Sequence, residues 1–237
     1  VSLMLNKPLK RNWGDLQSFA VEDLDINGLR GIISRYDEHF HYVASPSSPI
    51  DAENIGADII FAGMQMLRPR YHYMVADLPH DFSQVTLDTL DAADEILLVL
   101  APDMASIRAA AIALDTYEKL DYPAEKIKLV INWTFAEGGV AHKKIETALK
   151  HIVSLVVPFA PAHFINAINR GMPILTNRSE DPLVSMLEDF AYRHSKSTHK
   201  EIPPAQPSET WHRVNKRITE NSKDNRWTIR SLLSMMA

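Results

Sequence analysis

Four short apolar runs, each ended by a polar residue or a proline, lie between stretches with helical spacing of apolar residues. The runs are YHYMVAD (71–77), EILLVL (95–100), IKLVIN (127–132) and VSLVV (153–157). Apolar runs without polar alternation predict strands that are buried on both faces. Strands separated by helices form a parallel sheet with right-handed crossovers. The pattern therefore predicts an α/β fold, a three-layer α/β/α sandwich around a mostly parallel sheet.

The intervening segments predict the helices. Ser83 is a favourable N-cap for one of them, and Asp103 opens another that is rich in alanine. A further strand is expected at Phe40–Ala44, before the proline-rich stretch that starts at Ser45. The first 39 residues predict only short helices interrupted by glycine. The helices are expected at residues 51–67, 83–93, 103–120, 142–150, 162–170 and 181–192.

Polar residues and prolines follow the strands. Asp77 ends the first run, Asn132 ends the third, and Pro158 and Phe159 follow the fourth. Parallel strands end at one edge of their sheet, where open α/β sheets bind ligands, so these residues predict a ligand site. An unpaired buried carboxylate is costly, and Asp77 is therefore expected to face a polar partner or a metal. The alternatives are a loop cap for Asp77, a turn former for Asn132 and a strand stop for Pro158.

Composition narrows the chemistry. The chain has 237 residues, of which 46% are hydrophobic and 23% charged, as expected for a globular protein. It has no cysteine, which excludes disulfides, thiolate metal sites and thiol nucleophiles. No apolar run reaches the roughly 18 residues of a membrane span and no signal peptide is recognisable, so a cytoplasmic location is expected. No G-x-G-x-x-G dinucleotide loop and no G-x-S-x-G hydrolase elbow occurs.

The C-terminal part of the chain is basic, whereas the rest is acidic. Residues 196–237 hold 8 Lys+Arg against 4 Asp+Glu, a net charge of +4. Because the whole chain has a net charge of −5, residues 1–195 carry −9. Residues 195–208, rich in Ser, Thr, Lys and Pro, predict a linker, and residues 209–237 a basic amphipathic tail. Such a tail suits a membrane surface or a partner, or packs on its own domain. Specific nucleic-acid binding is not expected of the acidic body.

The run YHYMVADLPHDFSQVTLDTLDAADEILLVLAPDMASIRAAAIALD resembles part of the MinD/ParA-type ATPases. It is similar to the Walker B strand, its helix and the next strand–helix unit of these deviant Walker A (SIMIBI-type) P-loop NTPases. Within them it most resembles the CpaE/TadZ group of pilus-assembly ATPases. The stretches IKLVINW and VVPFAPAHFINAINRGMPI are similar to the adenine-side strand and closing helix of the family. The resemblance covers residues 1–194, which are expected to form a partial ATPase domain.

The resemblance assigns roles to five residues. Asp77 would be the Walker B carboxylate, a catalytic residue and metal ligand that holds Mg²⁺ through water. Pro79 would lie in the loop on the γ-phosphate side. Asn132, Pro158 and Phe159 would frame the adenine.

The family's phosphate-binding loop has no counterpart in the sequence. No G-x-x-x-x-G-K-[ST] occurs, and phosphoryl transfer depends on such a loop, its lysine and Mg²⁺. The polypeptide as given is therefore expected neither to bind ATP tightly nor to hydrolyse it, with ATP and Mg²⁺ as cofactors of an intact parent. The chain begins at Val1 without an initiator methionine, and a start inside a larger protein is expected.

Two functions follow from the resemblance. In the first, the chain is the C-terminal portion of a CpaE/TadZ-like ATPase for Flp/Tad pilus assembly or polar localisation. The parent would form a homodimer around ATP and bind pilus or secretion machinery, with peripheral contact at the inner membrane or cell pole. In the second, the chain is a non-catalytic MinD/ParA-like interaction or localisation module that acts through partner binding.

Overall fold

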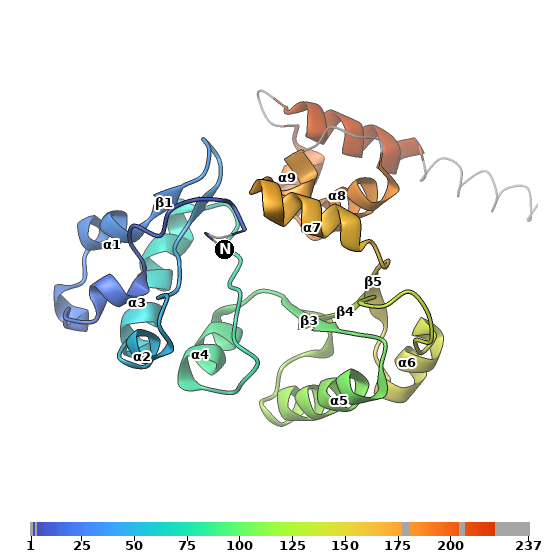
Figure 1. Ribbon diagram of the computed structural model, residues 1–237, viewed down its shortest axis with the longest axis horizontal. Helices are drawn as coiled ribbons and strands as arrows, with labels where there is room; N and C mark the ends of the chain where they lie inside the picture. Colours follow the sequence, from blue (N-terminus) through green and yellow to red (C-terminus); the bar gives the residue numbers. More distant parts are fainter. Residues whose placement is uncertain (1, 3, 177–180, 204–206, 221–237) are drawn as a thin grey trace, which may run out of the picture. The chain divides into compact units, whose positions relative to one another are not determined.

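The computed structural model describes residues 2, 4–176, 181–203 and 207–220 (Figure 1). Its contacts divide the chain into two compact units, Val1–Pro173 and Ile174–Ala237. The units are described separately below. The sequence places the end of the ATPase-like domain at residue 194 instead, and its division into domain, linker and tail stays a prediction.

The first third of unit 1 is mainly helical. It contains the 3₁₀ turns η1 (Trp13–Leu16) and η2 (Val21–Asp23), then α1 (Ile26–Ile32), α2 (Pro49–Glu53), α3 (Ala57–Leu67) and the turn η3 (Arg68–Arg70). Asp25 caps α1 by accepting a hydrogen bond from the Gly28 N–H at 2.7 Å. Leucine and isoleucine side chains of η1, α1 and α3 form one buried cluster. The expected short helices are confirmed, whereas the helix expected over 51–67 is two helices, because Gly56 is extended between them.

A short hairpin joins these helices. Strand β1 (Ser34–Arg35) pairs antiparallel with β2 (His41–Tyr42), and the Asp37 carboxylate accepts hydrogen bonds from the N–H groups of His39 and Phe40 in the turn. A parallel bridge between Asn12 and Ala44 ties the hairpin to η1. The strand expected at Phe40–Ala44 is therefore present, but shorter.

The second half of unit 1 is built on a parallel sheet in the order β3 (Ile96–Leu100), β4 (Ile127–Asn132) and β5 (Val153–Val157). Helices α4 (Gln84–Ala92), α5 (Met104–Lys119) and α6 (His142–Leu149) alternate with these strands. Leu129 and Ile131 of β4 are fully buried against Ile107 of α5 and Ile145 of α6, which cover one face of the sheet. The α/β fold class with a parallel sheet is confirmed.

The first predicted strand is absent. Residues 73–79 form no strand or helix, and Figure 1 draws this segment before α4 as a plain trace. Tyr73, Met74 and Val75 are exposed, Val75 by 92%, so the expected burial on both faces is wrong. A strand needs a neighbour for its backbone N–H and C=O groups, and no described residue supplies one.

Helix α7 (Pro161–Arg170) follows β5 and closes unit 1. It ends at Gly171, whose φ of +62° favours glycine over residues with a side chain. A Cβ atom on Gly171 would lie 2.1 Å from the Asn6 Cβ. This close approach fixes the end of α7 against the N-terminal turn.

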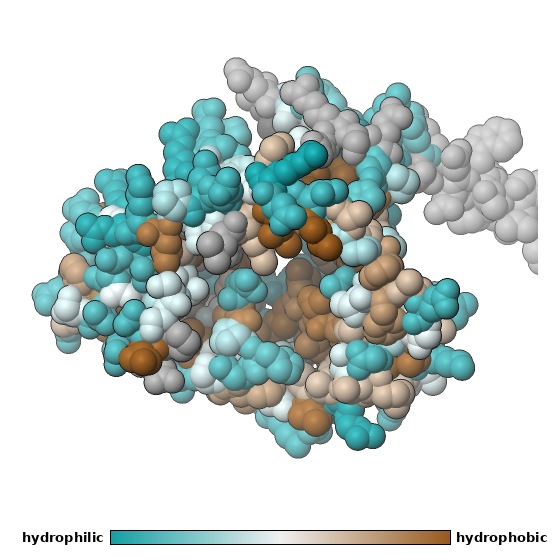
Figure 2. Space-filling view, viewed as in Figure 1, coloured by the Kyte–Doolittle hydropathy of each residue, from teal (hydrophilic) through white to brown (hydrophobic). Residues whose placement is uncertain are grey.

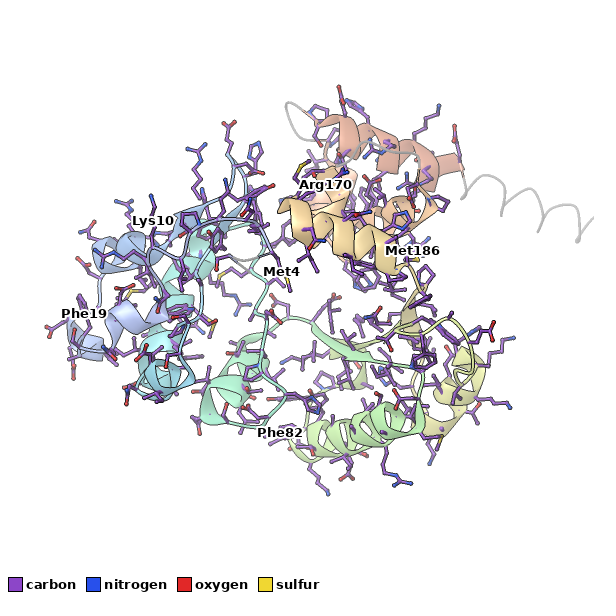
Figure 3. The ribbon with its side chains drawn as sticks, in the orientation of Figure 1. Met4, Lys10, Phe19, Phe82, Arg170 and Met186 are labelled. Atoms are coloured by element: carbon purple, nitrogen blue, oxygen red, sulfur yellow. The ribbon has the colours of Figure 1, made fainter. Side chains whose placement is uncertain are left out.

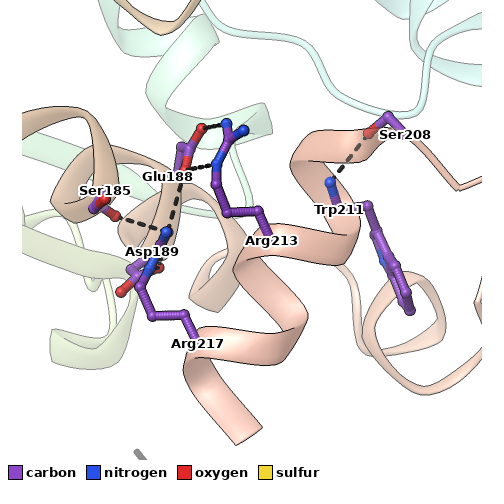
Figure 4. Close-up of polar contacts among 7 residues, drawn as sticks. All are labelled: Ser185, Glu188, Asp189, Ser208, Trp211, Arg213 and Arg217. Carbon is purple, nitrogen blue, oxygen red and sulfur yellow. Dashed lines mark hydrogen bonds and ion pairs between the residues drawn. The ribbon is translucent and has the colours of Figure 1, made fainter. Parts of the chain in front are cut away.

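Unit 2 contains η5 (Ile174–Thr176), α8 (Pro182–Arg193), α9 (Ser197–Glu201) and a helix over 209–220. The short helix α9 lies within residues 195–208, the stretch that the sequence predicts as a linker. Glu188 of α8, with only 3% of its side chain exposed, receives Arg213 and Arg217 of helix 209–220 (Figure 4). The tail prediction for residues 221–237, including Trp227, lies outside the described residues.

Candidate functional site

The carboxyl ends of β4 and β5 bring three of the predicted site residues together. Asn132 is paired with Val157, and the Trp133 N–H donates to the Val157 carbonyl at 2.9 Å, so the pairing continues to the strand end. Pro158 and Phe159 follow directly beside Asn132. The Asn132 amide makes no hydrogen bond to any described residue, and Phe159 is 43% exposed. An amide offers both a donor and an acceptor, and a phenyl ring offers a flat apolar surface.

The loop between β4 and α6 folds back toward the neighbouring strand. The Val140 N–H donates to the Pro102 carbonyl, just beyond β3, at 2.8 Å. The Trp133 and Phe135 rings meet edge to face with centroids 5.9 Å apart. A Cβ atom on Gly139 would lie 2.3 Å from the Trp133 ring, so only glycine lets the backbone lie this close.

This aromatic loop was missed in the sequence. Its signal was the aromatic residue directly after a strand end, followed by Phe135 and a Gly-Gly pair. Trp133 follows Asn132 in the chain, so the loop begins at the candidate site. The hydrogen bond from Val140 to Pro102 connects the loop to the end of β3.

Asp103 also lies at this edge, but its carboxylate is engaged by α5. It accepts hydrogen bonds from the Ser106 N–H at 2.9 Å and the Ser106 hydroxyl at 2.8 Å. These bonds, the backbone one first, lower the pKa of Asp103 below its usual value. The role of Asp103 in this structure is therefore that of the N-cap of α5.

Asp77 and Pro79 do not join this edge. Leu78, which lies between them in the chain, packs against a cluster that contains Ile96 and Ile127, the first residues of β3 and β4. Phe82 points toward α5 near its end (Figure 3), where its ring contacts Tyr117 with centroids 6.3 Å apart. The loop is thus held at the amino ends of the strands. The described contacts of Leu78 and Phe82 do not bring Asp77 to Asn132, and the role of Asp77 at the site stays a prediction.

The loop around Asp77 contains an acidic residue with a structural role. Asp81 accepts hydrogen bonds from the Ser83 N–H, the Ser83 hydroxyl and the Thr86 hydroxyl at 2.8–3.0 Å. The backbone bond is the main cause of its lowered pKa. Ser83 occupies the N-cap position of α4, as predicted, but its side chain makes no capping bond and Asp81 stabilises the helix start instead.

The residues at the edge fit part of a nucleotide. Asn132 and Phe159 suit a heteroaromatic base, whereas the triphosphate would need a glycine-rich loop that the sequence does not contain. In the described part of the chain, no three His, Asp or Glu residues are grouped as a metal site. None of its helices is long and apolar enough to cross a membrane.

Solved structures of other proteins share this architecture. A ParA family ATPase from Chlorobium tepidum TLS superposes with a TM-score of 0.71 at 18% identity, over 79% of this chain and 79% of that chain. The septum site-determining protein MinD from Pyrococcus horikoshii OT3, solved with Mg-ADP, gives 0.70 at 13% identity, over 86% and 81%. The chain has the ParA/MinD ATPase fold.

Sequence comparison adds nothing to this result. No protein-family model and no curated protein matches the chain. A third structure of the ParA/MinD fold, the MinC:MinD cell division complex of Aquifex aeolicus, superposes with a TM-score of 0.65 at 17% identity, over 87% of this chain and 81% of that chain. The ParA/MinD fold is thus evident from the arrangement of elements, at identities of 13–18%.

Proposed function

We propose that this chain supplies the base-binding part of a ParA/MinD-type ATP switch of the CpaE/TadZ kind. The proposal is carried by the position of Asn132, whose side chain hydrogen-bonds to no described residue, and of the exposed Phe159 at the carboxyl ends of the paired strands β4 and β5. In this proposal Asn132 exchanges hydrogen bonds with the edge of an adenine, while Phe159 and Pro158 contact its face. Stacking on an aromatic ring and pairing with an amide together suit a purine.

The chain alone is not expected to turn over ATP. The phosphate loop and its lysine would have to come from outside these 237 residues, because no such motif occurs among them. When bound, Mg²⁺ would neutralise phosphate charge, and Asp77 is the proposed residue that holds it through water. Asp77 and Pro79 would serve nucleotide only after their loop leaves the amino ends of the strands.

The finer assignment concerns the biological process. The resemblance of the run 71–115 to the CpaE/TadZ group supports a role in pilus assembly or polar localisation. The likeness of fold to MinD, which one solved structure holds with Mg-ADP and another with MinC, supports a nucleotide-dependent partner switch. We infer that the intact parent forms a homodimer around ATP and recruits pilus or secretion components.

Calorimetric titration of the 237-residue chain with adenosine, ATP and GTP in the presence of Mg²⁺ tests the base site. Weak binding is expected that prefers adenine, is the same for adenosine and ATP because no phosphate loop contributes, and is lost in Asn132→Ala and Phe159→Ala. Asp77→Ala is the control, and it should bind adenosine and ATP as the unsubstituted 237-residue chain does. Mg²⁺-dependent ATP hydrolysis abolished by Asp77→Ala, or binding unaffected by the two edge variants, would contradict the proposal.

The second candidate is a non-catalytic localisation module. It is favoured by the position of the Asp77 loop, held away from Asn132 by Leu78 and Phe82. This module would bind its partner equally with and without nucleotide. A pull-down of pilus components that is unchanged by ATP and by Asn132→Ala would support the module and count against the switch.

A further inference from the structure

One side of α8 is polar, and helix 209–220 lies against it (Figure 4). Its residues recur at spacings of three or four along α8, which places them on one side of that helix, and we call them the acidic face: Ser185, Glu188, Asp189 and Tyr192. Each of them accepts a hydrogen bond from helix 209–220. Ser185 accepts through its carbonyl, the two acids through their carboxylates, and Tyr192 through its hydroxyl, from the Asn215 amide at 3.1 Å. Both charges that α8 offers here are negative.

The geometry of the acidic face suits arginine. Arg213 donates through Nε at 3.3 Å to one oxygen of Glu188 and through Nη2 to the other. Arg217 donates through Nε at 2.8 Å and through Nη2 to Asp189. Such a fork of two nitrogens matches a carboxylate, whereas lysine offers only a point charge. The acidic face therefore recognises two guanidinium groups that lie four residues apart on one helix.

The contact depends more on charge than a permanent interface does. Val214, 3% exposed, is the one buried residue of helix 209–220, whereas Trp211 and Ile218 stay partly exposed. The outward side of the helix that is visible in Figure 2 is mainly hydrophilic. Permanent interfaces are mostly apolar, and polar contacts are typical of elements that associate reversibly. Glu188 and Asp189 pair with no other described cation, so the departure of the helix would leave two neighbouring carboxylates for another cationic group.

We propose that the acidic face is a docking site for an arginine-bearing helix of a partner protein, and that helix 209–220 occupies it as an intramolecular cover. The partner helix would carry two arginines four residues apart, with an apolar residue after the first, as Arg213, Val214 and Arg217 do. The cover is tethered to α8 through residues 195–208, and a tether gives it a high effective concentration. The apparent affinity for the partner therefore falls with the fraction of chains that are covered. This docking uses no residue of the proposed nucleotide site.

Fluorescence anisotropy with a labelled, alanine-rich helical peptide that contains Arg-Val-Ala-Ala-Arg tests the docking. The full chain with Arg213→Ala and Arg217→Ala, whose cover lacks both guanidinium groups, should bind this peptide at least about tenfold more tightly than the unsubstituted chain. Adding Glu188→Ala to this double variant should abolish binding. Lys216→Ala is the matched control, because Lys216 is 76% exposed and its ion pair is with Glu220 of the same helix at 4.0 Å. It should bind the peptide as the unsubstituted chain does. Circular dichroism melting verifies that the variants fold.

Cutting the tether is a second test that leaves every residue of both helices unchanged. A protease site inserted between residues 203 and 207 is cleaved in the folded full chain, and the peptide should then bind at least about tenfold more tightly than before cleavage, because it displaces a cover that is no longer tethered. A peptide with lysine in place of both arginines should bind at least about tenfold more weakly. Equal binding by the covered and uncovered forms, equal binding of the two peptides, or no binding to either uncovered form would overturn the proposal.

Discussion

Replacing Glu188 by alanine should release helix 209–220 from α8. The Glu188 carboxylate receives the Arg213 guanidinium through two nitrogens and the Arg217 Nη2 at 3.2 Å. Arg217 also donates to the Asp189 carboxylate, with its Nε at 2.8 Å, and to the Ser185 carbonyl at 3.1 Å (Figure 4). Glu188 is thus the one described acceptor that both arginines share.

The structure sets the size of the effect. Breaking a fully buried ion pair costs about 3–5 kcal/mol, because one charge is left unpaired. Here the arginine side chains keep 29% and 24% of their surface exposed, and Arg217 retains Asp189, so water offsets part of the loss. A cost of about 2–3 kcal/mol remains, which raises the population of the detached helix about 30- to 150-fold.

Limited trypsin digestion measures that population. Cleavage after Arg213 and Arg217, followed by mass spectrometry, reports the detached helix when reattachment is faster than cleavage. The control is Glu220→Ala, since Glu220 is 61% exposed and meets Lys216 only at 4.0 Å. Its effect should stay below about 0.5 kcal/mol, as for exposed pairs. Equal cleavage rates in the two variants would refute the role of Glu188.

Three further outcomes are expected. Gly139→Ala should displace the Trp133 ring, shift its fluorescence and destabilise unit 1 by about 1–3 kcal/mol in urea unfolding, because the new Cβ overlaps that ring; unchanged emission would contradict this contact. Leu129→Ala should cost about 2–5 kcal/mol, as its side chain is fully buried, whereas a loss below 1 kcal/mol would show that the β4 core is loose. The pKa of Asp103 is lowered in the folded chain, so its stabilisation is present above the ordinary value near 3.8 and lost as the pH falls through the lower folded value. Asp103→Asn should therefore destabilise α5 at pH 7, and this destabilisation should shrink as the pH falls through the folded pKa of Asp103; an effect that does not change with pH would contradict it.

The sequence predicted the strands whose neighbouring strands and covering helices belong to the same chain. Buried parallel strands are apolar throughout, so β3, β4 and β5 were found to within one residue. The same pattern failed at Tyr73–Asp77, because an apolar run indicates the preference for burial and not the presence of a neighbouring strand. Strand formation there depends on a partner that periodicity along one segment does not reveal.

The candidate site was predictable to the same extent. Asn132 and Phe159 lie at the same edge of the sheet, because the carboxyl ends of adjacent parallel strands lie side by side. The place of Trp133 could not be predicted, because it depends on the return of the loop to Pro102. The spacing of apolar residues likewise predicts an amphipathic helix at residues 209–220. Only the structure shows that its residues Arg213 and Arg217 bind the carboxylates of α8.

The burial of Leu78 gives the Asp77 loop a resting position. Carrying Asp77 to the nucleotide edge would require Leu78 to leave the buried cluster that contains Leu90 and Ile96. Exposing a half-buried leucine costs about 1 kcal/mol, so this contact alone disfavours the relocated form about fivefold. A bound nucleotide that favours the relocated form would have to overcome that bias. The binding of Mg²⁺ by Asp77 would therefore be coupled to the packing of Leu78 at the amino ends of the strands.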